Sequence, residues 1–210
     1  MAKRSVKRQQ WTSLIFALAA LLVFGASPAR AGTETGASGL ILVPSADTLA
    51  PGDAEFAVRY KDGRLGGSFT YGIFDRIEIG VNNMRKSSTS DFGIVIKGAI
   101  FEETASEPAV AVGFETGQSY VVVSKRLAPR VRAHLGLGAG DLEGVFAGVA
   151  LVVNTTTGRG LAPATTAMAE VTPRGVNAGV RLVFSPLVSA DVALVDLEEL
   201  VGGISFRVRF

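Results

Sequence analysis

The last eight residues of the chain constrain its fold more than any other stretch, because they alternate between small or apolar and polar side chains up to the final residue. The apolar side of this extended segment carries Ile204, Phe206, Val208 and Phe210, and the polar side carries Ser205, Arg207 and Arg209. The terminal residues of a soluble domain usually fray. A regular strand that runs to a terminal Phe therefore predicts that the last strand pairs with the first and closes a barrel. An ordinary last strand of a soluble sheet is the alternative.

Residues 1–31 have the pattern of a secretory signal peptide. Four bases near the start precede an 11-residue apolar run from Leu14 to Phe24, and Ala29 and Ala31 form a small-residue cleavage site. Eleven residues are too few to span a bilayer as a helix. We expect the mature chain to start at Gly32, to carry a leader over residues 32–53 and to form a barrel over residues 54–210.

The charge of the mature chain differs from that of the whole sequence. The signal holds five of the 21 basic residues and none of the 19 acidic ones, so the mature chain is slightly acidic. This balance argues against a nucleic-acid partner. The chain has no cysteine, which excludes a disulfide scaffold, a thiol nucleophile and a lipid-anchored N-terminal Cys.

Beyond the turn at Pro51-Gly52, apolar and polar residues alternate with period 2 in short segments separated by turn residues. We predict twelve strands, over residues 54–60, 65–72, 76–83, 91–101, 108–115, 119–126, 130–138, 144–153, 165–171, 177–184, 188–195 and 202–210. An even number of antiparallel strands of this length is typical of a transmembrane barrel. The predicted fold is therefore all-β, a closed antiparallel up-and-down transmembrane barrel, with the leader packed against it or plugging it.

Charged residues fall opposite the apolar residues of their own strands. A Lys or Arg that faced lipid at mid-depth would cost about 2 to 4 kcal/mol, so the charged face is predicted to line the lumen. Crowded charges that pair across strands, in a barrel of intermediate size, predict a narrow or occluded lumen. The predicted lumen-lining residues are Glu55, Arg59, Arg76, Glu78, Lys97, Glu115, Arg132, His134, Glu170, Arg181, Asp191, Arg207 and Arg209.

Several motifs resemble one family of bacterial envelope proteins. The leader segment from Gly39 to Ala46, the following Pro51-Gly52, and the hairpin from Tyr71 to Glu78 are similar to the YjbH-like outer-membrane proteins, as are later stretches at Glu170 and from Asn177 to Arg181. The resemblance implies an outer-membrane β-barrel, connected in some members with exopolysaccharide production or export. Outer-membrane barrels also commonly end in Phe, so Phe206, Val208 and Phe210 are the predicted signal for the barrel-assembly machinery.

The sequence offers little material for catalysis. His134 is the sole histidine, and no recognisable local motif joins it to a nucleophile such as Ser68 or Ser205. One His and no Cys are too few preferred ligands for a transition-metal site. We therefore expect no catalytic residues, no metal and no cofactor.

The predicted function is that of a non-enzymatic bacterial outer-membrane barrel, either structural or a narrow porin-like channel, with a link to exopolysaccharide production or export. Its expected partners are outer-membrane lipid, the barrel-assembly machinery and polysaccharide-export components. Two alternatives remain open at this stage. One is a soluble periplasmic β-barrel that binds a ligand in an apolar interior, and the other is an outer-membrane lipid hydrolase that uses His134.

Overall fold

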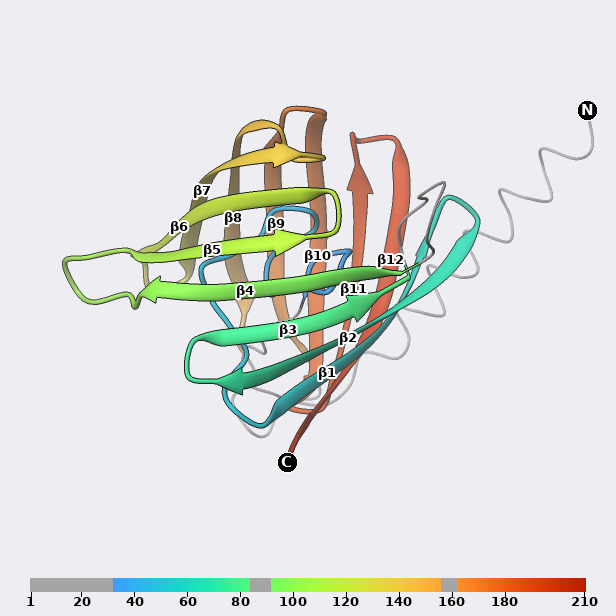
Figure 1. Cartoon of the computed structure of the whole chain (residues 1–210). Coiled ribbons are helices and arrows are strands. Elements are labelled where there is room, and N and C mark those ends of the chain that lie inside the picture. The colour runs from blue at the N-terminus through green and yellow to red at the C-terminus, as the bar shows by residue number, and fades with distance from the viewer. Residues whose placement is uncertain (1–31, 84–91, 156–161) are drawn as a thin grey trace, which may run out of the picture.

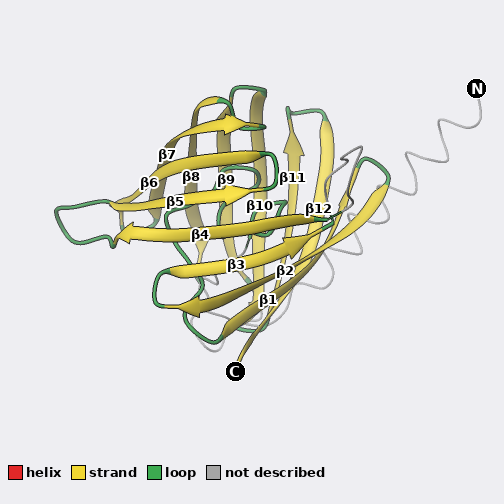
Figure 2. Cartoon of the chain, viewed as in Figure 1, coloured by secondary structure: helices red, strands yellow, loops and turns green. Residues whose placement is uncertain are grey.

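The computed structural model describes residues 32–83, 92–155 and 162–210, and these residues build a closed antiparallel β-barrel of twelve strands (Figure 1). Only strands, loops and turns occur in the described part of the chain (Figure 2). The strands are β1 (Asp53–Lys61), β2 (Arg64–Phe74), β3 (Ile77–Asn82), β4 (Gly93–Phe101), β5 (Ala109–Glu115), β6 (Gln118–Ala128), β7 (Val131–Gly140), β8 (Gly144–Asn154), β9 (Ala164–Thr172), β10 (Gly175–Ser185), β11 (Val188–Val195) and β12 (Glu199–Arg209).

The barrel closes between its first and last strands. β12 pairs antiparallel with both β11 and β1, and Phe56 on β1 lies opposite Phe206 on β12. The backbone N–H of Phe210 donates a hydrogen bond to the carbonyl oxygen of Gly52 at 2.9 Å, so pairing continues to the last residue. The predicted fold class, strand number and closure are confirmed.

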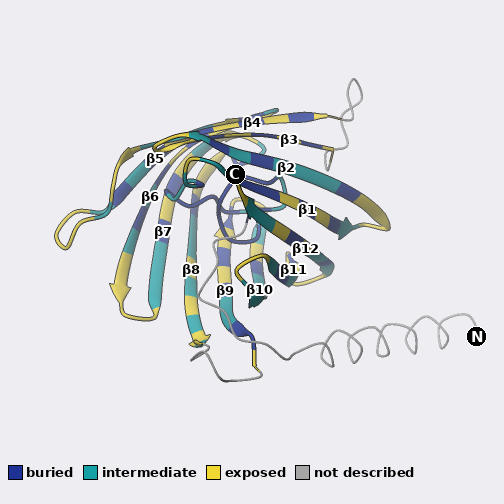
Figure 3. Ribbon diagram, turned by 90° about the horizontal axis from the view of Figure 1, so that it is seen from below, coloured by how far each residue is buried: buried dark blue, intermediate teal, exposed yellow. Residues whose placement is uncertain are grey.

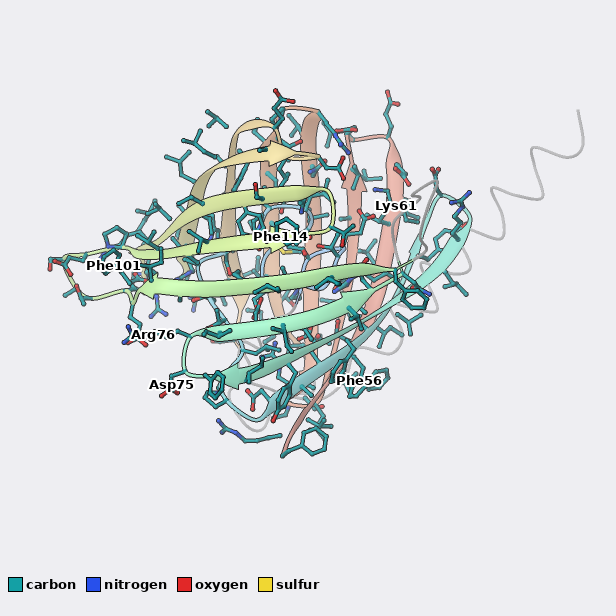
Figure 4. All side chains as sticks on the ribbon, viewed as in Figure 1. Phe56, Lys61, Asp75, Arg76, Phe101 and Phe114 are labelled. Carbon is teal, nitrogen blue, oxygen red and sulfur yellow. The ribbon has the colours of Figure 1, made fainter. Side chains whose placement is uncertain are left out.

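The outer surface of the barrel is apolar. On β3, Ile77, Ile79 and Val81 are exposed, while the residues between them are buried. The same alternation runs around the wall and appears as banding along the strands in Figure 3. Phe56 and Phe114 are among the outward aromatic side chains labelled in Figure 4. A ligand-binding soluble barrel would keep its apolar face inside, so the structure does not fit that alternative.

The two ends of the barrel differ in what they carry. We call the end where β1 begins and β12 ends the terminal mouth, and the other end the opposite mouth. The terminal mouth holds the β2–β3, β4–β5 and β6–β7 connections, and the opposite mouth holds the β1–β2 and β11–β12 turns. Within the described residues there is no helix with the length and apolar character needed to cross a membrane.

The apolar core lies between the leader, residues 32–52, and the inner wall. Val43 and Ala46 of the leader pack with Tyr120, Val122 and Phe146 of the wall. A second cluster joins Leu40 and Ile41 to inward side chains of β9, β11 and β12, namely Met168, Ala193, Val195 and Val201. The leader and apolar side chains of the inner wall thus fill the lumen together.

Candidate functional site

The leader occupies the lumen. It is drawn in blue inside the barrel in Figure 1. Most of its residues are buried, and Figure 3 colours them dark blue. Near the opposite mouth, Glu34 forms an ion pair with Lys61 at 2.9 Å, and near the terminal mouth Asp47 forms one with Arg132 at 3.1 Å. The leader therefore runs through the barrel from one mouth to the other before it enters β1.

Glu170, on β9, holds the middle of the leader. Its carboxylate accepts hydrogen bonds from the backbone N–H groups of Ile41, Leu42 and Val43, at distances of 2.6 to 3.2 Å, and from the side-chain amide of Asn177 at 3.1 Å. A buried carboxylate is costly unless such donors satisfy it. Three consecutive backbone N–H groups of the leader thus point at the Glu170 carboxylate and form an anion-binding concavity.

Glu78 and Lys97, on the neighbouring strands β3 and β4, hold a second point of the leader. Their side chains are 0% exposed and form an ion pair at 2.9 Å. Glu78 also accepts hydrogen bonds from the backbone N–H and hydroxyl of Ser38 and from the N–H of Leu49, while Lys97 donates to the Ser38 carbonyl. The leader therefore satisfies polar groups that the pair alone would leave without partners.

Two arginines bind the leader through its carbonyl groups. Arg181, on β10, donates to the carbonyl oxygens of Gly39 and Leu40 at 2.9 Å, and Arg59, on β1, donates to those of Gly32 and Thr33 at 2.9 and 3.0 Å. Glu55 accepts from the N–H of Gly32 at 2.8 Å and pairs with Arg207 at 2.7 Å. The start of the leader is thus bound by a basic side chain through its carbonyl groups and by an acidic side chain through its N–H group.

Glycines in the wall make room for this segment. A Cβ at Gly148, on β8, would lie 2.6 Å from the Cδ1 atom of Leu40. A Cβ at Gly72, on β2, would overlap the backbone carbonyl of Ala50. The missing side chains at these positions allow the leader to approach the wall closely.

His134 lies on β7 opposite Ser124 on β6, and its Nδ1 atom is 2.7 Å from the Ser124 hydroxyl oxygen. The same oxygen accepts a hydrogen bond from the backbone N–H of Ala46 in the leader, and Ser124 is 0% exposed. The contact of His134 is with Ser124, whereas the sequence suggested Ser68 or Ser205. A nucleophile sealed beneath the leader cannot reach a lipid, so this geometry does not favour the hydrolase alternative.

The structure distributes the predicted lumen-lining residues over three environments. Eight are buried inside the barrel: Glu55, Arg59, Glu78, Lys97, Glu115, His134, Glu170 and Arg181. Arg132, Asp191 and Arg207 are half-buried. Arg76 and Arg209 lie at the rim of the terminal mouth, where they pair with Glu102 and Asp53. The sequence placed Arg76 on a strand, but it lies in the β2–β3 turn with a φ of 70°, which takes it off the inner wall.

The other predicted positions are at the two ends of the chain. Phe206 and Phe210 face outward from β12 and its end, and Val208 is half-buried opposite Ala54. Ala29 and Ala31 of the predicted cleavage site lie outside the described residues. In the described part of the chain, no group of three His, Cys, Asp or Glu residues is arranged to hold a metal ion.

Sequence reasoning missed several residues that hold the leader. Asn177 precedes the inward-facing Arg181 by four residues on β10, and both are buried. Since side chains of a strand alternate between its two faces, the inward position of Asn177 could have been found from this spacing. Ser38 and Asp47 lie in the leader, where no periodic pattern marks them. Their roles depend on contacts with distant strands.

A narrow constriction lies between the two mouths of the lumen. The opposite mouth holds a cavity of about 870 Å³, and one of about 380 Å³ extends from the terminal mouth along the leader. Between them, beside Leu40, Ile41 and Met168, lies a space of only about 20 Å³, which Arg59 and Asp191 also line. Such a space holds about one water molecule.

Comparisons with known proteins identify a matching family and similar barrel structures. The family described as "YjbH: Exopolysaccharide biosynthesis protein YbjH" matches residues 32–166. The KdgM porin, solved in complex with disordered oligogalacturonate, is similar with a TM-score of 0.50 and 9% identity, over 75% of this chain and 99% of that one. The outer membrane protein Omp33 of Acinetobacter baumannii is similar with a TM-score of 0.48 and 13% identity, over 75% of this chain and 97% of that one. No curated protein matches the sequence.

Proposed function

The chain belongs to the YjbH exopolysaccharide biosynthesis family, and from this premise we propose that it is a non-enzymatic outer-membrane channel that its own leader keeps closed. The observation that carries the proposal is the narrow constriction beside Leu40 and Ile41 of the leader and Met168 of the wall. Larger cavities lie on both sides of it.

The membrane location is supported by the outward apolar face and by the porin-like fold. A cleaved signal peptide over residues 1–31 and recognition of the C-terminal Phe210 by the barrel-assembly machinery complete the proposed route to the outer membrane. Components of polysaccharide export are the proposed partners, since the family carries that description.

A structural role is the second candidate, because the leader makes many buried hydrogen bonds with the wall through Glu78, Glu170 and Arg181. In that case the leader would stiffen the barrel and never leave. The channel and the structural role differ in whether a small change at the constriction produces a current.

Conductance in planar lipid bilayers separates the two roles. Residues 32–210 should give no steady current, because the space at the constriction is only about 20 Å³ and holds about one water molecule. The double variant Leu40→Ser with Met168→Ser should give measurable openings, since polar side chains hydrate the passage. The matched control Leu187→Ser changes an exposed leucine in the β10–β11 turn and should remain silent. Wide openings of the unmodified chain would show that the leader does not close the lumen, and a silent double variant would favour the structural role.

A further inference from the structure

The terminal mouth contains two adjoining cavities with a shared wall. One of about 610 Å³ lies under the β4–β5 connection, and the other, of about 380 Å³, lies between the leader and strands β7 to β10. Asp47, Arg126 and Arg132 line both of them. We call the two cavities together the basic vestibule. Each has the size of an ordinary ligand pocket, about 300 to 1,000 Å³.

The two mouths differ in charge. Among the described residues, six bases line the basic vestibule, against three acids: Arg76, Lys125, Arg126, Arg130, Arg132 and Arg181, against Asp47, Glu102 and Glu103. The described lining of the cavity at the opposite mouth has three bases and four acids: Lys61, Arg64 and Arg174, and Glu34, Asp62, Glu115 and Asp141. An anion is therefore favoured at the terminal mouth and not at the opposite one.

Two of the six bases have no partner within the part of the chain that the structure describes. Lys125 donates to three carbonyl oxygens of the β4–β5 connection, and Arg132 pairs with Asp47 and Glu103. Within the described residues, the guanidinium groups of Arg126 and Arg130 have neither a hydrogen-bond nor an ion-pair partner. Both line the 380 Å³ cavity, from the end of β6 and from the β6–β7 turn.

The remaining lining of this cavity matches a sugar better than a simple anion. Thr155 and Thr166 supply hydroxyl groups, while Val152 and Met168 supply an apolar surface. A guanidinium group presents a planar fork of donors that fits a carboxylate. A uronic acid combines a carboxylate with hydroxyl groups and a C–H face, so it uses all three features.

We infer that the basic vestibule binds a carboxylate-bearing segment of polysaccharide through Arg126 and Arg130. This inference rests on the proposed function, because it names the class of saccharide that the proposed channel would meet at this mouth. The vestibule is enclosed by the leader and by the buried Arg181, which places the bound segment next to the constriction at Met168. Binding there would put an acidic chain at the closed passage.

Calorimetric titration of detergent-refolded residues 32–210 tests the inference. A tetramer of a uronic acid is the probe, and a neutral glucose tetramer is its control. We expect the acidic tetramer alone to bind, more weakly as salt is added. Arg126→Gln with Arg130→Gln should weaken binding at least about tenfold, because two charge-assisted contacts are lost. Arg174→Gln, which removes a base at the opposite mouth, should leave binding unchanged.

Several results would overturn the inference. These are equal binding of both tetramers, unchanged binding by the Arg126 and Arg130 double variant, an equal loss with Arg174→Gln, or displacement of the tetramer by acetate or glycerol phosphate at the same concentration. Heat-dependent gel mobility checks that each variant is folded. The proposed channel is judged separately, because Arg126 and Arg130 do not line the constriction and their replacement should leave the lumen closed.

Discussion

Both carboxylate oxygens of Glu170 accept hydrogen bonds from the backbone N–H of Leu42, at 3.2 and 3.0 Å, across 128 residues of sequence. The contact joins the ninth strand to the leader and is flanked by the N–H groups of Ile41 and Val43. It holds Leu40 and Ile41 against Met168 at the constriction. In the proposed closed channel, closure of the lumen depends on a charge in the wall and on backbone groups in the leader.

Removing the Glu170 carboxylate should loosen the leader without opening the barrel wall. Glu170→Ala leaves the N–H groups of Ile41, Leu42 and Val43 without this acceptor, and each of the two buried ones, Ile41 and Val43, costs about 1 to 3 kcal/mol. We expect the temperature at which the folded band converts on an SDS gel to fall clearly. Glu143→Ala, at an exposed glutamate before β8, is the matched control and should behave as the unmodified chain does. Equal conversion temperatures for the two variants would contradict the role of Glu170.

The outward face should tolerate charge only near the rims. Ile79 lies at the middle of β3, opposite Ile96 of β4, so Ile79→Arg places a charge near mid-depth in lipid. The expected loss of unfolding free energy in lipid vesicles is about 2 to 4 kcal/mol. Leu127→Arg, near the end of β6, should cost about 0 to 1 kcal/mol. Denaturant titration measures both, and equal losses would argue against a membrane-spanning wall.

The β4–β5 connection should respond to acid through Glu103. Burial raises the pKa of the Glu103 carboxyl. The hydrogen bond from the N–H of Arg126 and the charge of Arg132 together lower the pKa by more, so it lies below the ordinary 4.5. When the pKa of a carboxyl is lower in the folded chain than in the unfolded chain, its ionised form stabilises the fold. This stabilisation is complete at a pH above the pKa of the unfolded chain and is lost as the pH falls through the pKa of the folded chain.

The unfolding temperature of the unmodified chain, relative to that of Glu103→Gln, tests this pH dependence. The difference should be largest near neutral pH and should shrink as the pH falls below 4.5. Glu107→Gln, at an exposed residue of the same connection, should give no such trend. A difference that grows in acid would have the wrong sign for this account.

The wall of the barrel follows from local patterns. The period-2 alternation of segments such as Ile77 to Asn82 determines which residues face inward, so Glu78 could be assigned to the inner face from its neighbours alone. Strand ends were less predictable. β12 begins at Glu199 and not at residue 202, because Asp196 and Leu197 adopt φ angles of 52° and 57° and make a tight turn.

The occupant of the lumen was harder to derive in detail. A plugging leader was one expectation, but its sequence has no period that identifies the partners of Ser38 or Ile41. Glu78 lies 40 residues from Ser38, and Glu170 lies 129 residues from Ile41. Such pairs meet only after the barrel has closed, so their identity depends on register and on the path of the leader. The Ser124–His134 contact likewise follows from the β6–β7 register.

Thiol labelling at Val43 tests most directly whether the leader fills the lumen. The chain contains no cysteine, so Val43→Cys and Thr48→Cys each introduce a single probe. Val43 is 0% exposed, whereas Thr48 lines the 610 Å³ cavity of the terminal mouth. In folded protein in lipid vesicles, a charged maleimide should label Thr48→Cys rapidly and leave Val43→Cys unlabelled until the chain is denatured. Equally rapid labelling of Val43→Cys in the folded barrel would contradict the account, because it would place the leader outside the closed lumen.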